Sequence, residues 1–259
     1  MKEDKDNIGN LLREFYTTFG MPGEGPPQDL NVTATFGGNV PEADITVLRA
    51  ALSDDVARRQ MSKCRILLDD LATRLTSSEL LRELSSVQLP AGRSVEELSS
   101  GVFWFALAAS LDRREGGIPV TPLDVDFDLP LPVKVQMTVQ GSLVLRLYIA
   151  LVYMREGALA DLIAASARSG GLCSGRVKKL LDSDFLRRVR NALSHGSFSP
   201  CLAGIVFHDD QGALVATPGF LSWLCTWLMV IGVQALTAST RSPHIAQNHI
   251  VDSGTAPRC

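Results

Sequence analysis

Apolar residues recur at helical spacing along most of the chain, and this pattern predicts a protein built mainly of helices. An amphipathic helix is expected over residues 1–20, and a longer one from about Ile45 to Leu75. Between them, residues 20–41 are rich in Gly and Pro, which interrupt helices and indicate a connector. Within this connector, the β-branched and aromatic residues of 32–36 predict a small strand.

Two capping-box patterns divide the segment that follows. Residues 76–79 and 94–97 each begin with Thr or Ser and end with Glu. In this spacing the two side chains satisfy backbone N–H groups at the start of a helix. The patterns predict a short helix that ends near Leu84 and a longer one that ends near Arg113.

The middle of the chain predicts an irregular segment followed by a return to helix. Residues 116–132 contain four prolines and indicate a loop or an edge strand, whereas residues 140–167 resume helical spacing. We therefore expect an N-terminal extension and connector over 1–43, a helical domain over 44–238, and a flexible C-terminal tail over 239–259.

The last apolar run, residues 219–240, is nearly long enough to span a bilayer and contains no charged residue. Ser222, Thr226 and Gln234 interrupt it, and no basic cluster lies at either end. A central helix of a bundle can also be apolar on all sides. A buried helix is favoured, so no membrane is expected, and a membrane-associated helical protein remains an alternative.

Composition indicates a folded protein of a reducing compartment. The chain has 259 residues, of which 46% are hydrophobic and 20% charged, so it can bury a full core. Its five cysteines form no Cys-x-x-Cys pair, and the charged N-terminus has no apolar run behind it. These features favour a cytoplasmic protein without disulfides or a zinc site. The net charge of −3 excludes a globally basic protein.

The segment from Asp182 to Phe198 contains the residues best suited to phosphate chemistry, because it combines arginine, asparagine and histidine side chains. Asp182 and Ser183 are good N-cap residues, and Gly196 is placed to end the helix. An apolar stripe at helical spacing predicts one buried face, formed by Phe185, Leu186, Val189 and Leu193. A helix from about Ser183 to about His195 follows, with polar side chains on its outer face.

The string Arg190-Asn191-Ala192-Leu193-Ser194-His195, followed by Gly196 and Phe198, resembles the Arg-x4-His signature of the HEPN superfamily. The resemblance is clearest over residues 138–238. It implies an all-α helical bundle with a short β-hairpin or strand insertion after the motif helix, here around residues 205–212. It also implies a metal-independent endoribonuclease without a cofactor, which acts as a homodimer with a composite active site.

The resemblance implies a concrete mechanism. The RNA 2′-hydroxyl would attack the adjacent phosphorus and leave a 2′,3′-cyclic phosphate. Arg190 would stabilise the phosphate charge, His195 would move a proton, and Asn191 would orient His195 or the phosphate. Nearby polar side chains would bind the RNA backbone: Lys178, Lys179, Arg187, Arg188 and Ser194. Such enzymes are often toxins or phage-defence proteins, so an antitoxin or regulatory protein is a further expected partner.

Other interpretations remain open. Arg190 can instead pair with an acid while His195 merely ends a helix, and a HEPN-like domain without activity can bind a nucleotide, an RNA or a protein. Four basic residues, Lys178, Lys179, Arg187 and Arg188, are equally consistent with a solvated surface.

Acidic and histidine residues outside the motif have other interpretations. Asp124, Asp126 and Asp128 alternate in a way that can hold Mg²⁺, although an exposed edge strand fits them better. The remaining histidines are interpreted as incidental: His208 in a turn, and His244 and His249 in the tail.

Overall fold

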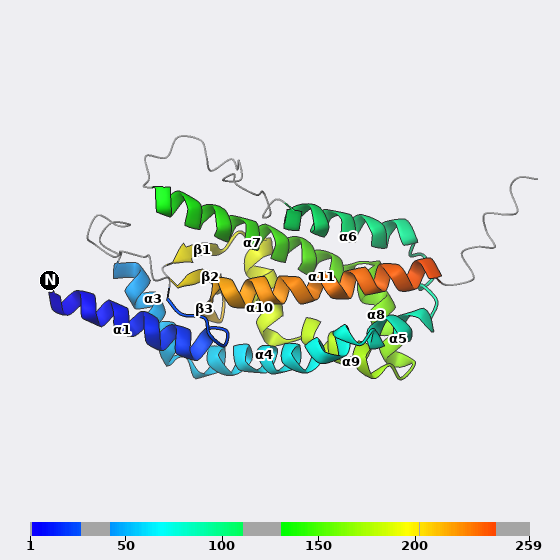
Figure 1. Cartoon of the computed structure of the whole chain (residues 1–259), viewed down its shortest axis with the longest axis horizontal. Helices are drawn as coiled ribbons and strands as arrows, with labels where there is room; N and C mark the ends of the chain where they lie inside the picture. The colour runs from blue at the N-terminus through cyan, green and yellow to red at the C-terminus, as the bar shows by residue number, and fades with distance from the viewer. Residues whose placement is uncertain (1, 27–41, 111–130, 202, 242–259) are drawn as a thin grey trace, which may run out of the picture.

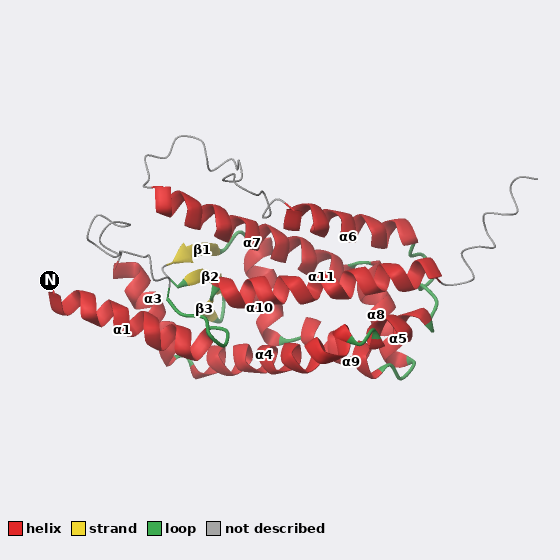
Figure 2. Cartoon of the chain, viewed as in Figure 1, coloured by secondary structure: helices red, strands yellow, loops and turns green. Residues whose placement is uncertain are grey.

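The computed structural model describes residues 2–26, 42–110, 131–201 and 203–241. Within these residues the chain forms ten helices and one three-stranded sheet, which confirms the expected all-α bundle with a short strand insertion (Figures 1 and 2). The helices are α1 (Lys2–Phe19), α3 (Glu42–Ser53), α4 (Asp55–Thr76), α5 (Glu79–Ser85), α6 (Val95–Ser110), α7 (Leu131–Glu156), α8 (Ala158–Arg168), α9 (Leu172–Leu181), α10 (Asp184–Ser194) and α11 (Pro218–Arg241). The strands are β1 (Phe198–Cys201), β2 (Gly204–Asp209) and β3 (Gly212–Ala216).

The apolar helix α11 runs through the centre of the bundle. It packs against α4 on one side and against α6 and α7 on the other, and it also contacts α5 and α8 (Figure 1). Its length and composition would allow it to cross a membrane. The residues that it buries follow helical spacing: Phe220, Leu221, Leu224, Cys225, Leu228, Ile231, Gly232, Ala235, Ala238 and Ser239. This is the packing expected of a central bundle helix.

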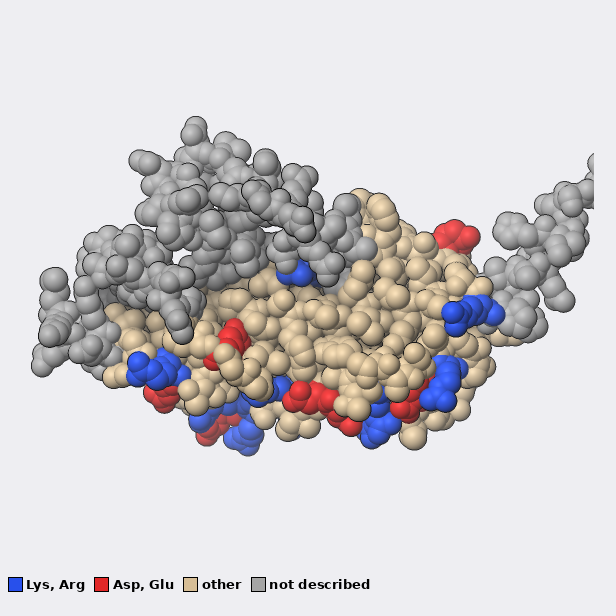
Figure 3. Space-filling view, in the orientation of Figure 1, with Lys and Arg blue, Asp and Glu red and all other residues tan. Residues whose placement is uncertain are grey.

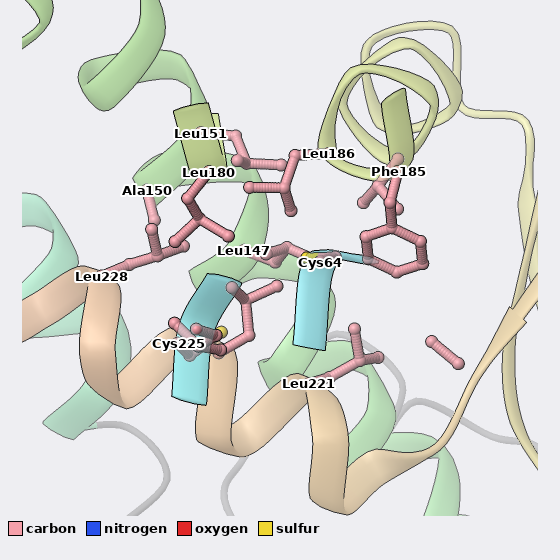
Figure 4. Packing of buried hydrophobic residues seen from close by; sticks show 14 of the residues in the cluster. Cys64, Leu147, Ala150, Leu151, Leu180, Phe185, Leu186, Leu221, Cys225 and Leu228 are labelled. Atoms are coloured by element: carbon pink, nitrogen blue, oxygen red, sulfur yellow. The ribbon is translucent and has the colours of Figure 1, made fainter. Parts of the chain in front are cut away.

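Helix α10 is held by its apolar stripe. Phe185 and Leu186 are fully buried and point toward Cys64 of α4, with Leu147 of α7 and Leu221 of α11 beside them (Figure 4). Val189 and Leu193 are buried as well, as the periodicity predicts. Burial of such side chains stabilises a fold by about 1.5–3 kcal/mol each, so α10 is a rigid support for the polar groups on its outer face.

The sheet is an antiparallel meander that directly follows α10. Phe198 of β1 pairs with Phe207 of β2, and Ile205 of β2 pairs with Ala216 of β3. The turn between β2 and β3 has two residues and ends at Gly212, whose φ of +116° suits glycine. The expected strand and turn around residues 205–212 are therefore present, and β1 adds a third strand that the sequence did not predict.

Two breaks divide helices that the sequence predicted as continuous. The expected helix from Ile45 to Leu75 is split at Asp54, whose carboxylate accepts hydrogen bonds from the N–H groups of Val56 and Ala57 and so begins a new helix. The expected helix over 140–167 is split at Gly157, the N-cap of α8. A separate helix, α9, then precedes α10.

The two capping boxes have different outcomes. Ser94 Oγ accepts a hydrogen bond from the Glu97 N–H at 3.1 Å and begins α6 as predicted. Thr76 remains inside α4, where its hydroxyl donates to the Thr73 carbonyl at 2.7 Å. The short helix α5 begins instead after Ser78, which has a left-handed backbone with φ of 59°.

The first segment of the chain contributes to the same core as the rest. Phe15 and Phe19 of α1 are buried and belong to one apolar cluster that extends to Ala238. The Tyr16 hydroxyl donates to the Ala203 carbonyl at 3.3 Å, and Glu24 accepts a hydrogen bond from the N–H of Gly219 at 2.8 Å. The core is thus continuous across the expected boundary between residues 43 and 44.

Some expectations fall outside the described residues. They include the small strand over 32–36, the end of the helix near Arg113, and the histidines His244 and His249. Of the expected flexible tail over 239–259, the first three residues continue α11 to Arg241, and the rest lies outside the described residues. The three carboxylates Asp124, Asp126 and Asp128 lie outside them as well.

Candidate functional site

The motif helix α10 begins and ends where its sequence predicts. Ser183 is the N-cap, and its Oγ accepts a hydrogen bond from the Leu186 N–H at 3.4 Å. His195 is the C-cap residue, and Gly196 follows it with φ of +65°. The left-handed backbone at Gly196 turns the chain away from the helix axis.

This turn is a Schellman motif that positions the next polar residue. The N–H of Ser197 donates to the Ala192 carbonyl at 2.8 Å, and the N–H of Gly196 donates to the Leu193 carbonyl at 3.2 Å. The Ser197 carbonyl in turn accepts a hydrogen bond from the N–H of His208 at 2.8 Å. The end of α10 and the end of β2 are therefore joined through the backbone.

An open cleft of about 470 Å³ lies at this junction. Six polar residues line it: Asn191, His195, Ser197, His208, Asp209 and Asp210. Asn191 and His195 lie on the same face of α10, one turn apart, as the sequence predicted. Both imidazoles are exposed to solvent, so a ligand in the cleft can reach them. The cleft brings together two histidines from different elements, which is a set of groups suited to proton transfer.

Sequence reasoning missed His208. It was interpreted as an incidental turn residue, whereas the structure places it in β2 beside the turn and on the wall of the cleft. Its proximity to His195 depends on the pairing of β1 with β2 and on the Schellman turn. The sequence around His208 contains no local signal of that tertiary contact.

Arg190 does not line this cleft. In an α-helix, residues five positions apart point in directions about 140° apart around the axis, so Arg190 and His195 diverge. Arg190 Nη1 lies 3.5 Å from Asn191 Oδ1, a long hydrogen bond that links it to the wall of the cleft. Burial lowers the pKa of Arg155, at the end of α7, and the charges of Arg190 and Arg187 lower it further. The charge of Arg190 is therefore near Arg155, and Asn191 lies between Arg190 and His195 around the axis of α10.

Arg188 has a structural role that contradicts its expected contact with RNA. Its side chain is only 2% exposed, and its Nε and Nη2 donate to the two carboxylate oxygens of Asp209 at 2.7 and 2.8 Å. Its Nη1 donates to Gln60 Oε1 of α4 at 3.0 Å. Its burial contradicts the solvated surface that was the other interpretation of Arg188. The pairing with an acid that the sequence left open for Arg190 is found instead at Arg188, which fastens α10 to β2 and α4.

The other expected RNA-binding residues are exposed. Ser194 lies next to His195 in the last turn of α10. Arg187 pairs with Asp184 at 2.7 Å near the start of α10, and Lys178 pairs with Asp182. Lys179 is exposed on α9 and forms no ion pair with any residue that the structure describes. Lys178, Lys179 and Arg187 therefore lie on α9 and at the start of α10 and do not line the cleft.

No group of three or more His, Cys, Asp or Glu residues in the described ranges is arranged to hold a metal ion. Comparisons of the chain with protein-family models, with curated proteins and with solved structures found no match. The resemblance to the HEPN superfamily therefore depends on the motif residues and their placement alone.

Proposed function

We propose that the protein is an endoribonuclease that cleaves RNA without a metal ion, and that the cleft at the end of α10 is its active site. The observation that supports this proposal is the presence of His195 and His208 on the walls of one open cleft. Cleavage through the RNA 2′-hydroxyl requires one group that accepts a proton and another that donates one, and two imidazoles can supply both.

The proposed reaction is a single displacement at phosphorus. One imidazole takes the proton of the 2′-hydroxyl while the 2′-oxygen forms a bond to phosphorus. The other imidazole, in its protonated form, gives its proton to the 5′-oxygen as the bond from phosphorus to that oxygen breaks. The products are a 2′,3′-cyclic phosphate and a free 5′-hydroxyl, and exchange with water restores both histidines.

The remaining residues of the cleft assist this step. The amide of Asn191 orients an imidazole or a non-bridging phosphate oxygen. Asp210 also lines the cleft, and its carboxylate can accept a hydrogen bond from an imidazole N–H or from a ribose hydroxyl. Asp209 is compensated by Arg188, so its charge repels a phosphate less than that of a free carboxylate would.

The role proposed for Arg190 differs from the one that the sequence predicts. Because it faces away from His195 on the same helix, it stabilises either the phosphate next to the scissile one or a phosphate held in the cleft of a second copy. The second arrangement agrees with the composite dimeric site that the HEPN resemblance implies. In both, the loss of the guanidinium lowers cleavage without removing the acid or the base.

The test is cleavage of a mixed single-stranded RNA pool in excess EDTA, with the cut ends examined for cyclic phosphate. Wild type is compared with His195→Ala and Arg190→Ala variants that retain the wild-type circular dichroism spectrum and melting temperature. Cleavage by wild type that is lost in His195→Ala and lowered in Arg190→Ala supports the proposal. Equal cleavage by all three proteins contradicts it, and no cleavage by any of them favours a HEPN-like module that binds RNA, a nucleotide or a protein without cutting.

We further propose a cytoplasmic location and a role of the toxin or defence type, with an antitoxin or regulatory protein as a partner. Expression of the wild-type chain in a bacterial host tests this role. A slowed growth rate that His195→Ala relieves supports it, and equal growth of the two strains contradicts it.

A further inference from the structure

A groove at the opposite end of α10 carries cations that form no ion pair within the described residues. It lies between α4 and the segment that joins α9 to α10, with a volume of about 390 Å³. Arg59 and Lys63 project from α4, and Lys179 projects from α9. All three side chains are exposed.

The acids in this groove are already neutralised. Asp182 pairs with Lys178, and Asp184 pairs with Arg187 at 2.7 Å. Arg59 donates only to a backbone carbonyl, that of Asp55, at 3.1 Å. Neither Arg59 nor the two lysines forms an ion pair with any residue in the described ranges. The groove therefore presents three uncompensated positive charges on a protein whose net charge is −3. Such a local surplus attracts a polyanion.

The hydrogen bonds of Arg188 connect the groove to the histidine cleft. Gln60 lines the groove and accepts a hydrogen bond from Arg188 Nη1. Asp209 lines the cleft and accepts the hydrogen bonds from Arg188 Nε and Nη2. One buried guanidinium thus fixes a wall of the groove relative to a wall of the cleft. The eleven residues of α10 separate the two sites by roughly 16 Å. A strand of a few nucleotides spans this distance.

In Figure 3 the charged side chains of the visible face gather along the lower edge of the molecule, over α4, where basic and acidic residues alternate, and the surface over α11 carries almost none. The groove is therefore distinguished by the pairing of its own acids, Asp182 and Asp184, with Lys178 and Arg187.

We propose that this groove binds the phosphate backbone of a single-stranded RNA whose scissile phosphate lies in the cleft of His195 and His208. The inference rests on the proposed nuclease function. Among the residues that the structure describes, no aromatic side chain lines the groove, and its apolar wall consists of Val56 and Leu67. Base stacking on an aromatic ring is therefore absent, and the groove holds the backbone independently of sequence. It is an electrostatic guide that delivers RNA to the cleft.

Binding is tested with a fluorescent 2′-O-methyl oligoribonucleotide, which lacks the nucleophile and stays intact. The groove variant is Arg59→Gln, Lys63→Gln, Lys179→Gln. A control variant with the same net charge, Arg13→Gln, Arg82→Gln, Arg168→Gln, changes three exposed arginines on α1, α5 and α8. For single strands, each phosphate contact contributes about 0.7 to the slope of log K against log salt. In the groove variant the magnitude of this slope should fall by about 2, and the affinity at low salt should fall at least tenfold. In the control variant neither quantity should change.

Lysine footprinting examines the wild-type protein and so is independent of any variant's folding. Acetylation of Lys63 and Lys179 should fall several-fold when the 2′-O-methyl strand is added. Equal acetylation with and without RNA overturns the proposal and leaves an acidic protein segment as the occupant to examine. Equal losses of affinity in the groove and control variants also overturn it, because they would show that RNA affinity depends only on the overall charge of the protein.

Cleavage of unmodified RNA separates this inference from the proposed function. If the wild type cleaves RNA and the groove variant binds and cleaves it as well as the control variant does, the proposed role of the groove is wrong and the proposed active site stands. Wild type that binds the 2′-O-methyl strand through the groove but cleaves no RNA overturns the nuclease and supports the groove as an RNA site.

Discussion

The guanidinium of Arg188 and the carboxylate of Asp209 form a bidentate ion pair, at 2.7 and 2.8 Å, with side chains that are only 2% and 9% exposed. The pair joins the middle of α10 to the end of β2. Asp209 also accepts a hydrogen bond from the N–H of Gln211 at 3.0 Å, which shapes the turn into β3. One carboxylate therefore fixes the helix, the strand and the turn that surround the histidine cleft.

Arg188→Ala should destabilise the protein strongly, because it leaves Asp209 buried without its partner. Loss of one member of a buried pair costs about 3–5 kcal/mol of unfolding free energy. The neighbouring variant Arg187→Ala removes an exposed pair and should cost less than about 1 kcal/mol. Urea unfolding of both variants measures the difference. The double variant Arg188→Met, Asp209→Leu should recover part of the lost stability. Equal losses of unfolding free energy in Arg188→Ala and Arg187→Ala would contradict the assigned role of Arg188.

Stability should fall when the pH drops below about 4. Burial alone raises the pKa of Asp209, but the hydrogen bonds and charge of Arg188 outweigh it and hold this pKa below its ordinary value. Burial likewise opposes ionisation of Glu83, and the N–H groups and hydroxyl at the start of α9 outweigh it, so its pKa is also lowered.

A carboxyl group with a lowered folded-state pKa stabilises the protein above its unfolded-state pKa. That contribution is lost as the pH falls through the folded-state value. Unfolding free energies measured from pH 7 to pH 2.5 should therefore decline most steeply at the acidic end. Glu83→Gln should make this decline shallower, whereas the same change at Glu14, for which no such contacts exist in the described structure, should not.

Gly196→Ala should destabilise the turn that follows α10. The position has open space for a methyl group, so the cost comes from the left-handed backbone alone, about 1 kcal/mol. In a chain of this length that corresponds to a decrease of about 2–4 °C in the melting temperature. Gly196→Asn should lose less, since asparagine tolerates this conformation. A larger loss for Asn than for Ala would show that the backbone conformation is not the cause.

His208→Ala should lower RNA cleavage by about 10²–10⁴-fold if this imidazole is the second proton-transfer group. The fold should be retained, because the side chain is exposed and the bond to Ser197 uses the backbone. Ser194→Ala, which changes an exposed residue beside His195, should reduce cleavage by less than tenfold. Single-turnover cleavage rates provide the comparison, and full activity in His208→Ala would remove this residue from the mechanism.

Thiol labelling should detect unfolding. Burial raises the pKa of Cys64 to about 12, and burial together with the nearby charges of Glu83 and Glu79 raises the pKa of Cys173 to about 12. Cys201 and Cys225 are buried as well. In a Cys259→Ser variant, an aromatic disulfide reagent should titrate almost no thiol in the native protein and four in guanidinium. Rapid labelling of the native variant would contradict this packing.

The motif helix could be predicted because its signals are local. Ser183, the apolar stripe and Gly196 lie within fourteen residues of one another, and each acts on its own turn of backbone. The assignment of Arg188 could not be made in the same way, because its partner Asp209 lies 21 residues away in another element. A run of basic residues identifies a charged segment but does not reveal which side chain turns inward.

The two histidines illustrate the same limit. His195 was singled out because the motif includes it, whereas His208 acquires its position only from strand pairing and a helix-ending turn. The break at Asp54 was missed for a different reason, since helix-forming apolar residues continue from α3 into α4 with no Gly or Pro between them. There the side-chain cap, rather than the hydrophobic pattern, decides where one helix ends and the next begins.

The hydrogen bonds of Glu24 have a consequence for synthesis on the ribosome. Its carboxylate accepts from the Thr217 hydroxyl and from the N–H of Gly219, residues 193 and 195 positions away, so the N-terminal segment closes onto the start of α11. At ordinary translation speeds the partners of Glu24 emerge about 10–40 s after it. During that interval α1 already has α3 and α4 as packing partners, whereas the hydrogen bonds that join Glu24 to the start of α11 form only after α11 has been made.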